Sequence, residues 1–342
     1  MNPNLTLKPL PLLARRQGLA LWLWIAIFTS SAAPALMSET FAERLGWGAR
    51  DVVVILHVDD AGMSHTSNLG AIEALEQGVA SSCSVMMPCS WVSEMAHFLQ
   101  KNPKIDAGLH LTLTAEWKGY RWGPLAGKLQ VPGLVDDEGC LWPSVQEVAA
   151  HASPDEVDRE LRAQIARAER LHIPITHLDS HMGTLFARQD YFERFARLGI
   201  EKNIPVLTVS SQGAHLSPDE RASAAPLEPW LAKLWNAGLP ALDDLYTGFT
   251  SLTGDKTERI LALFQELKPG VTEILFHASR PSDEFPAVTA SSAARGADLK
   301  VLTDPRVERA IRERGIILTT WRELHERRQK SGVSELPTPS GR

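Results

Sequence analysis

The sequence predicts an α/β protein: a distorted β/α (TIM-like) barrel of about seven mostly parallel strands in a single domain. From residue 50 onward, short apolar runs alternate with amphipathic segments, as expected for strands separated by helices. The first run, Val52-Val-Val-Ile-Leu56, is continuous and β-branched, which is typical of a buried parallel strand. No Gly-x-Gly-x-x-Gly or Walker sequence follows it, so a closed barrel ranks above a nucleotide-binding open sheet.

The remaining elements follow the same alternation along the chain. Ser153-Pro-Asp-Glu156 has the form of a capping box with proline at the first helical position, and the spacing of Asp255 and Glu258 indicates a second capping box. Residues 212–250 show no clear pattern. We expect strands at 52–56, 81–87, 107–113, 173–178, 204–209, 272–277 and 316–319, and helices at 67–77, 91–100, from 154 onward, 190–198, 255–267 and 304–314.

Residues 37–328 are predicted to form the globular domain, and 115–150, rich in Gly, Pro and Trp, are a long loop inserted into it. The polar tail at 329–342 is expected to be disordered.

The segment 1–36 has two interpretations. Arg15 and Arg16, an apolar run at 19–28 and the small residues ending at Ala35 are typical of a secretory signal peptide, which predicts a periplasmic or secreted protein. The run is too short for a stable membrane span, which needs ~20 residues. Alternatively, Met37 is the true start, the upstream residues are an extension and the protein is cytoplasmic.

The overall charge limits the partners. The chain of 342 residues has a formal charge of −6, and no long basic run lies outside its ends, which argues against a nucleic-acid partner. A neutral substrate such as a sugar fits this balance better. Three cysteines make neither a disulfide framework nor a structural zinc site. A homo-oligomer remains compatible with the sequence.

Polar residues follow four of the apolar runs. The segments are His57-Val-Asp-Asp-Ala-Gly62, Gly108-Leu-His-Leu-Thr112, His177-Leu-Asp-Ser-His181 and Phe276-His277. In β/α barrels the carboxyl ends of the strands carry the active site. Asp59 and Asp60 cannot both point inward from a regular strand, but Gly62 allows the chain to turn so that both carboxylates line one pocket.

A cluster of imidazole and carboxylate groups suits a divalent metal ion such as Zn²⁺, whereas Mg²⁺ usually prefers oxygen ligands. Such an ion lowers the pKa of a bound water and polarises a carbonyl. A further carboxylate can then accept the proton of the water, and a second acid can protonate a leaving amine.

Three of these segments, His57-Val-Asp-Asp-Ala-Gly-Met-Ser64, Gly108-Leu-His-Leu-Thr112 and Thr176-His-Leu-Asp-Ser-His181, resemble the signature blocks of the YdjC-like carbohydrate deacetylases. This family includes chitooligosaccharide and hopanoid-linked sugar deacetylases. The resemblance runs from about Glu43 to His325, and it departs from the family at His57-Val58 and at His181-Met-Gly-Thr184.

The resemblance implies a distorted β/α barrel with one divalent metal ion, Mg²⁺ or Zn²⁺, held by Asp60, His110 and His181. Asp59 would be the general base and His277 the general acid. The substrate class would be an N-acetylated carbohydrate, either an oligosaccharide or a glycolipid, from which metal-activated water removes the acetyl group.

Further residues are expected to lie around these ligands. We expect His177 to lie behind them and Asp179 to orient His181 or to cap a turn, and no role is assigned to His57. Trp117, Trp122 and Trp142 are candidates for stacking on sugar rings. Two other functions remain open: a metal-dependent phosphoesterase or nuclease, and a non-catalytic carbohydrate-binding protein on the same scaffold.

Overall fold

A computed structural model describes residues 39–250, 252, 254–332 and 335–336 of the chain, and these residues form one compact unit. Its centre is a curled sheet whose seven strands all pair in parallel, in the order β4-β3-β2-β1-β6-β5, with β7 beside the first half of β1. The strands are β1 (Val52–Ala61), β2 (Ser82–Val85), β3 (Ala107–Leu111), β4 (Ile175–Ser180), β5 (Asp244–Tyr246), β6 (Gly270–Phe276) and β7 (Ile317–Leu318).

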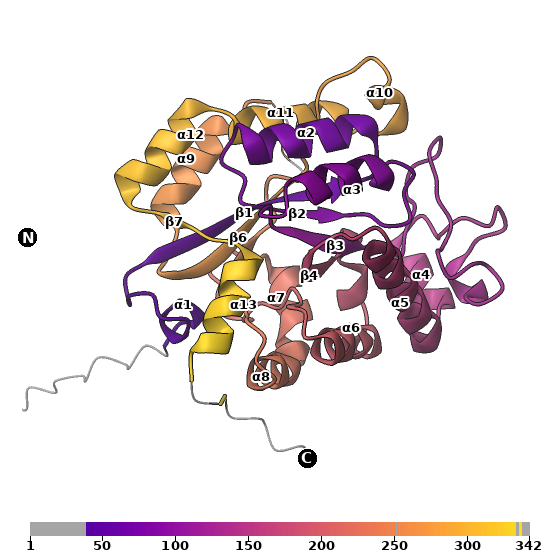
Figure 1. Cartoon of the computed structure of the whole chain (residues 1–342), viewed down its shortest axis with the longest axis horizontal. Coiled ribbons are helices and arrows are strands. Elements are labelled where there is room, and N and C mark those ends of the chain that lie inside the picture. Colours follow the sequence, from indigo (N-terminus) through magenta and orange to yellow (C-terminus); the bar gives the residue numbers. More distant parts are fainter. Residues whose placement is uncertain (1–38, 251, 253, 333–334, 337–342) are drawn as a thin grey trace, which may run out of the picture. The chain divides into compact units, whose positions relative to one another are not determined.

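Helices cover the outside of this sheet. In Figure 1, α2, α3, α9, α11 and α12 lie on one side of the strands, and α5, α6 and α8 lie on the other. The α-helices are α1 (Phe41–Arg44), α2 (His65–Glu76), α3 (Val92–Lys101), α4 (Val145–His151), α5 (Pro154–Arg170), α6 (Gln189–Lys202), α7 (Pro218–Ala224), α8 (Glu228–Asn236), α9 (Thr257–Glu266), α10 (Phe285–Val288), α11 (Ser292–Leu302), α12 (Pro305–Arg314) and α13 (Trp321–Lys330). Three 3₁₀ helices are η1 (Pro132–Leu134), η2 (His181–Phe186) and η3 (Ala225–Leu227).

The predicted β/α barrel is confirmed, with a weak join between β4 and β5. The strand expected at 204–209 makes only single bridges, Val206 to Leu178 of β4 and Val209 to Leu242 next to β5. Pro205 has no backbone N–H, so this stretch cannot pair continuously along one edge. Two backbone hydrogen bonds connect this segment to both neighbours and close the barrel. The N–H of Leu207 donates to the carbonyl of Leu178 (2.8 Å), and the N–H of Leu242 donates to the carbonyl of Thr208 (3.0 Å).

Helix ends test the capping predictions. The capping box of Ser153 and Glu156 forms at the start of α5, as predicted. The one expected at Asp255 and Glu258 was wrong: α9 begins at Thr257 and has no side-chain cap, and the carboxylate of Asp255 accepts a hydrogen bond from the N–H of Thr257 instead (2.9 Å). The patternless segment 212–250 holds α7, η3, α8 and β5.

Side chains of β1 alternate between two apolar clusters. Val54, Leu56 and Val58 belong to the cluster that packs against the outer helices. Val53 and Ile55 belong to a second cluster, with Trp235 and Trp321 among its members, on the inner face of the curled sheet. Because side chains alternate along a strand, His57 and Asp59 continue this inner face toward the carboxyl end of β1. The interior therefore changes from apolar to polar along the barrel axis.

The ends of the chain bear on two predictions. The predicted signal segment 1–36 lies outside the described residues. In the stretch expected to be disordered, Gln329 and Lys330 belong to α13, and Leu336 exchanges two hydrogen bonds with the Asn236 side chain (2.8 and 3.0 Å). Within the described part of the chain, no helix combines the length and apolar character that a membrane span requires.

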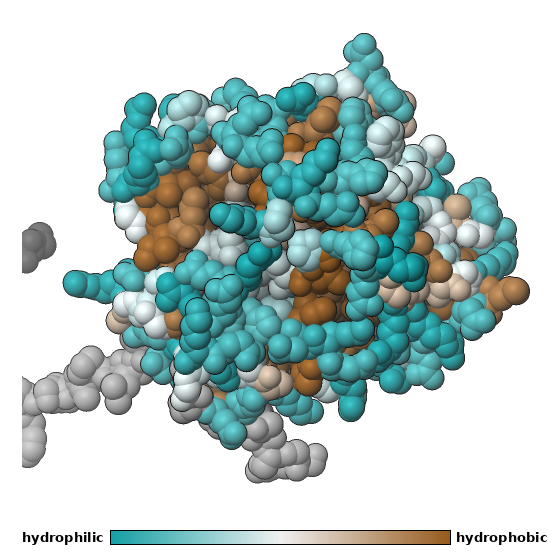
Figure 2. All heavy atoms as spheres, in the orientation of Figure 1, coloured by the Kyte–Doolittle hydropathy of each residue, from teal (hydrophilic) through white to brown (hydrophobic). Residues whose placement is uncertain are grey.

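The outer helices show mostly hydrophilic side chains, with apolar ones visible between them (Figure 2).

Candidate metal centre

The carboxyl end of β1 brings two neighbouring carboxylates into one pocket. The pairing of β1 with β2 shifts register between Val58 and Ala61, and Asp60 takes a left-handed conformation with φ of 63°. This conformation is uncommon for any residue except glycine, although Asp tolerates it better than most. The turn expected at Gly62 therefore begins already at Asp60. Gly62 is still required, because its φ is +84° and a Cβ there would lie 2.9 Å from Val92.

The three predicted ligands meet in space. Oδ1 of Asp60 lies 3.4 Å from Nε2 of His110 and 3.3 Å from Nδ1 of His181. The three donor atoms lie within 4.8 Å of one another, and all three residues are buried. Oδ1 of Asp60 has no hydrogen-bond partner among the described residues. A buried carboxylate oxygen that only faces two imidazole nitrogens is costly by itself and fits a cation held between the three groups.

A second carboxylate orients each of these histidines. Oδ1 of Asp179 lies 2.6 Å from Nδ1 of His110, and Glu116 lies 3.1 Å from Nε2 of His181. In both rings the nitrogen opposite the carboxylate is the one that faces Asp60, an arrangement that is common around protein metal ions. We expected Asp179 to orient His181, but it contacts His110 instead. The carboxylate that contacts His181 belongs to Glu116, which was not predicted from the sequence.

Without a metal ion, the neighbouring charges of this cluster shift the pKa values of His181 and Asp60 in opposite directions. Burial lowers the pKa of His181, but Glu116 and Asp60 raise it by more, to about 10. Burial raises the pKa of Asp60, yet Arg295 and His181 outweigh this effect and hold it well below its usual range. Without a metal ion, a proton on His181 balances the carboxylates, and a bound cation would replace that proton.

The two residues expected to move protons stand next to each other beside the cluster. Oδ2 of Asp59 lies 3.7 Å from Nε2 of His277, whose side chain is 15% exposed. Oδ1 of Asp59 accepts a hydrogen bond from Ser84 (3.3 Å). Burial raises the pKa of Asp59, but His110 and His57 lower it by more, so the carboxylate is ionised. Burial also lowers the pKa of His277.

A fully buried polar layer lies beneath Asp59. His57 forms its centre: Nε2 is 3.2 Å from Asp59 and 3.3 Å from Asp179, and Nδ1 is 3.4 Å from Glu273. Burial lowers the pKa of His57, but Asp179, Asp59 and Glu273 raise it well above its usual value. Burial raises the pKa of Glu273 to about 7. The residue to which we assigned no role is therefore the link between the base and the barrel interior.

His177 also belongs to this layer. Its ring stacks on Trp321 with 5.2 Å between centroids, and Nε2 lies 3.6 Å from Oδ2 of Asp179. Gly108 makes the space, because a Cβ at that position would lie 2.5 Å from the imidazole. His177 thus lies behind the cluster and does not face Asp60.

Two side chains of helix α11 contact the site. Arg295 donates a hydrogen bond to Oδ2 of Asp60 (2.6 Å), and Asp298 accepts one from the backbone N–H of His277 (2.9 Å). The other oxygen of Asp298 pairs with the buried Lys256 at 2.5 Å. These three residues had no strand-end position to mark them and were missed by the sequence analysis.

The aromatic candidates differ in position. Trp122 is buried and donates to the carbonyl of Thr114 (3.0 Å), and Trp142 donates to the carbonyl of Gly133 (2.8 Å). The guanidinium carbon of Arg295 lies 5.5 Å above the ring centroid of Trp117. Trp117 therefore adjoins the cluster.

Trp91, which we did not single out, is 42% exposed at the rim. Its ring packs on His65 with centroids 4.9 Å apart, and its backbone N–H donates a hydrogen bond to the carbonyl of Gly62 (3.2 Å). Trp91, in the segment between β2 and α3, is thus tied to the loop after β1, which begins two residues beyond Asp60.

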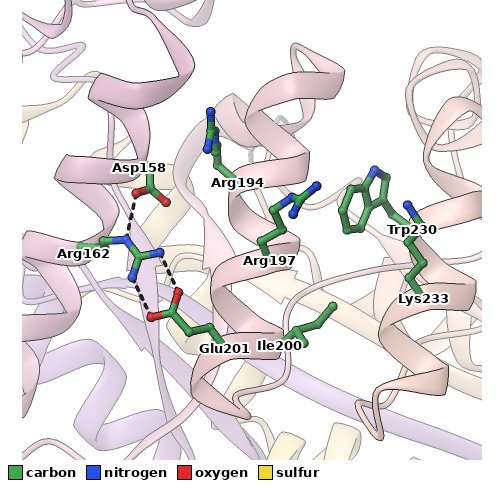
Figure 3. A pocket seen from close by; sticks show the side chains of 8 residues that line it. All are labelled: Asp158, Arg162, Arg194, Arg197, Ile200, Glu201, Trp230 and Lys233. Carbon is green, nitrogen blue, oxygen red and sulfur yellow. Dashed lines mark hydrogen bonds and ion pairs between the residues drawn. The ribbon is translucent and has the colours of Figure 1, made fainter.

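A separate hollow on the outer surface does not resemble an active site. It lies between α5, α6 and α8, and its most prominent feature is the pairing of Arg162 with Asp158 and Glu201 at 2.8 and 2.7 Å (Figure 3). Lys233 lies 4.0 Å from the centroid of Trp230. Arg162, Arg194 and Arg197 there are each paired with a carboxylate, and none of the predicted site residues lines the hollow.

Fold and site together define a β/α-barrel protein with a buried carboxylate–imidazole centre at the carboxyl ends of its strands. Comparison with known proteins identifies the family within this class. Residues 53–313 match the family model described as YdjC-like protein, and the chain belongs to this family.

Two relatives agree with this assignment, and one solved structure has the same fold. A carbohydrate deacetylase of Thermus thermophilus is 33% identical over 83% of this chain and 97% of its own length. A chitooligosaccharide deacetylase of Serratia marcescens is 30% identical over 80% of this chain and 99% of its own. A crystal structure from Enterococcus faecalis, provisionally described as a cellobiose-phosphate cleavage protein, has the same fold, with a TM-score of 0.68, 24% identity and coverage of 80% of this chain and 99% of that one.

Proposed function

We propose that this protein is a metal-dependent carbohydrate N-deacetylase, which hydrolyses the acetamido group of an N-acetylated oligosaccharide or glycolipid. The observation that carries the proposal is the convergence of Asp60, His110 and His181 around an unpartnered carboxylate oxygen, with Asp59 and His277 beside it. The deacetylase names of the T. thermophilus and S. marcescens relatives support the reaction and the substrate class.

Asp60, His110 and His181 would hold one divalent cation. Their mixed oxygen and nitrogen donors suit Zn²⁺ better than Mg²⁺, for which all-oxygen shells are usual. A cation at this position would supply Lewis acidity, activating water and polarising the acetyl carbonyl.

The neighbouring residues handle the protons. Asp59 is ionised and accepts the proton of the attacking water, which is the task of a general base. His277 gives a proton to the nitrogen of the departing amine, because an amine anion is a poor leaving group. Since burial lowers the pKa of His277, the ring takes this proton from Asp59, 3.7 Å away, which has received it from the water. Trp91 and Trp117 border the cluster and would bind the sugar through the apolar faces of its rings.

The test is an acetate-release screen over N-acetylated glycans, with and without a chelator. Asp59→Asn should keep the metal and lose turnover, whereas His110→Ala should lose both, since only His110 is a ligand. Equal loss of metal in the two variants would remove this division of labour. Acetate release that a chelator does not affect would contradict the metal-dependent reaction.

The two alternatives make different predictions. A phosphoesterase would release phosphate from phosphate esters rather than acetate from glycans. A non-catalytic binding protein would retain the glycan without turnover. The only lysine or arginine that forms an ion pair with Asp59, Asp60, Glu116 or Asp179 in the described part of the chain is Arg295, which leaves little positive charge to bind a phosphate group.

A further inference from the structure

The candidate metal centre contains one permanent positive charge, and that charge binds a metal ligand. Nη1 of Arg295 donates to Oδ2 of Asp60 at 2.6 Å, and its Nε donates to Ser291 at 2.8 Å. Arg295 is 8% exposed and Asp60 is 1% exposed, so water screens this pair weakly. The position of the guanidinium is fixed from the other side as well, by the ring of Trp117.

This contact divides the two oxygens of Asp60 between two cations. Oδ2 is occupied by Arg295, so only Oδ1 is free to face His110 and His181. A guanidinium also withdraws negative charge from the carboxylate that it binds and repels a divalent ion held on the other oxygen. Both effects weaken the grip of Asp60 on a metal ion, and both leave more of the ion's positive charge for its remaining ligands.

We propose that Arg295 is a positioning residue that sets the electrophilicity of the metal centre, keeping Asp60 a single-oxygen, partly neutralised ligand at the expense of metal affinity. The inference rests on the metal site of the proposed function. A purely structural role for Arg295 makes the opposite prediction, since loss of a residue that merely holds Asp60 in place would weaken metal binding. The two roles therefore differ in the sign of one measurable quantity.

The experiment compares Arg295→Gln with Arg295→Lys in the full-length protein. Gln keeps a hydrogen-bond donor for Oδ2 of Asp60 without the charge, and Lys keeps the charge without the planar fork. Arg280→Gln is the matched control, because Arg280 pairs with Glu73 at 2.5 Å, is 49% exposed and contacts none of the centre's carboxylates. Zn²⁺ affinity is measured by calorimetric titration of the metal-free proteins, together with their thermal unfolding with and without Zn²⁺.

We expect Arg295→Gln to bind Zn²⁺ more tightly by on the order of tenfold, because a repelling charge is gone. Its metal-free form should unfold at a lower temperature, and Zn²⁺ should raise that temperature by more than in the wild type. Arg295→Lys should stay near the wild-type affinity, as should Arg280→Gln. Acetate release at saturating Zn²⁺ should fall in Arg295→Gln.

Unchanged or weaker Zn²⁺ binding by Arg295→Gln would overturn the inference, and so would an equal gain in affinity by Arg295→Lys. A wild-type protein that binds no divalent ion would overturn this inference and the proposed function together. A wild-type protein that binds Zn²⁺ but releases no acetate would contradict only the proposed function, and the order of affinities would still decide the role of Arg295.

Discussion

Substitution of Lys256 by methionine should destabilise the protein strongly, although Lys256 touches no predicted site residue. Its ammonium group is buried (2% exposed) and lies 2.5 Å from Asp298, which is 1% exposed. After Lys256→Met, Asp298 would keep only the N–H of His277 as a partner. The carbonyl of Phe249, the second acceptor of Lys256, would still receive the N–H of Leu252. The cost is therefore mainly that of one buried, unpaired carboxylate.

Loss of one partner from a buried ion pair costs about 3–5 kcal/mol. In a domain of this size each kcal/mol lowers the melting temperature by about 2–4 °C, so Lys256→Met should melt about 10 °C below the wild type. Urea unfolding followed by tryptophan fluorescence measures the free energy directly. Lys300→Met is the matched control: the Lys300–Asp255 pair, at 3.1 Å, has side chains 63% and 51% exposed, and its loss should change stability far less.

A double-mutant cycle isolates the charge. Asp298→Asn retains an oxygen to accept the N–H of His277, so the pair Lys256→Met with Asp298→Asn leaves no buried charge. We expect the double variant to be more stable than the sum of the two single losses by about 2 kcal/mol or more. Additive losses, or a Lys256→Met variant as stable as the Lys300→Met control, would refute this account of the pair.

Three further predictions concern the site. Burial raises the pKa of Glu273 from 4.5 to about 7, so its contribution to stability is complete below pH 4.5 and is lost as the pH rises through 7, a loss on the order of 3 kcal/mol. Glu273→Gln should flatten the fall in unfolding free energy over this range, and an unchanged slope would contradict the assignment. Glu116→Gln should weaken Zn²⁺ binding by about tenfold in a calorimetric titration, because the carboxylate that orients His181 is lost; equal affinities would exclude that role. Trp91→Ala should raise KM about fivefold for an N-acetylated disaccharide and leave kcat nearly unchanged, whereas Leu129→Ala, at an exposed position on the inserted loop, should alter neither. Equal kinetics of the two variants would argue against a sugar contact at Trp91.

Strands and helices with strong periodic patterns could be predicted from the sequence. The continuous β-branched run of β1 and the capping box of α5 appear where the pattern predicts them. The segment 204–209 has the composition of a strand, but its pairing depends on neighbours that the sequence does not name. The helices within 212–250 were missed because they are short and each has a proline in its first turn, which reads as a break in the pattern.

The candidate site was predictable where chemistry and position coincide. Asp60, His110 and His181 each lie at the end of a strand, and such ends meet at one edge of a parallel sheet. His57 lay within the same segment, but an imidazole at an inward position of a strand does not by itself indicate whether it faces a site or the core. Arg295 could not be foreseen, since it reaches Asp60 across 235 residues of chain from the middle of a helix.

Arg295 and Asp298 stand three positions apart on α11, nearly one turn, so both project toward the barrel. One serves Asp60 and the other serves His277. A small rotation or translation of α11 would therefore displace both the metal ligand Asp60 and the proposed proton donor His277. Any attempt to redesign one half of the chemistry by altering α11 inherits a change in the other half.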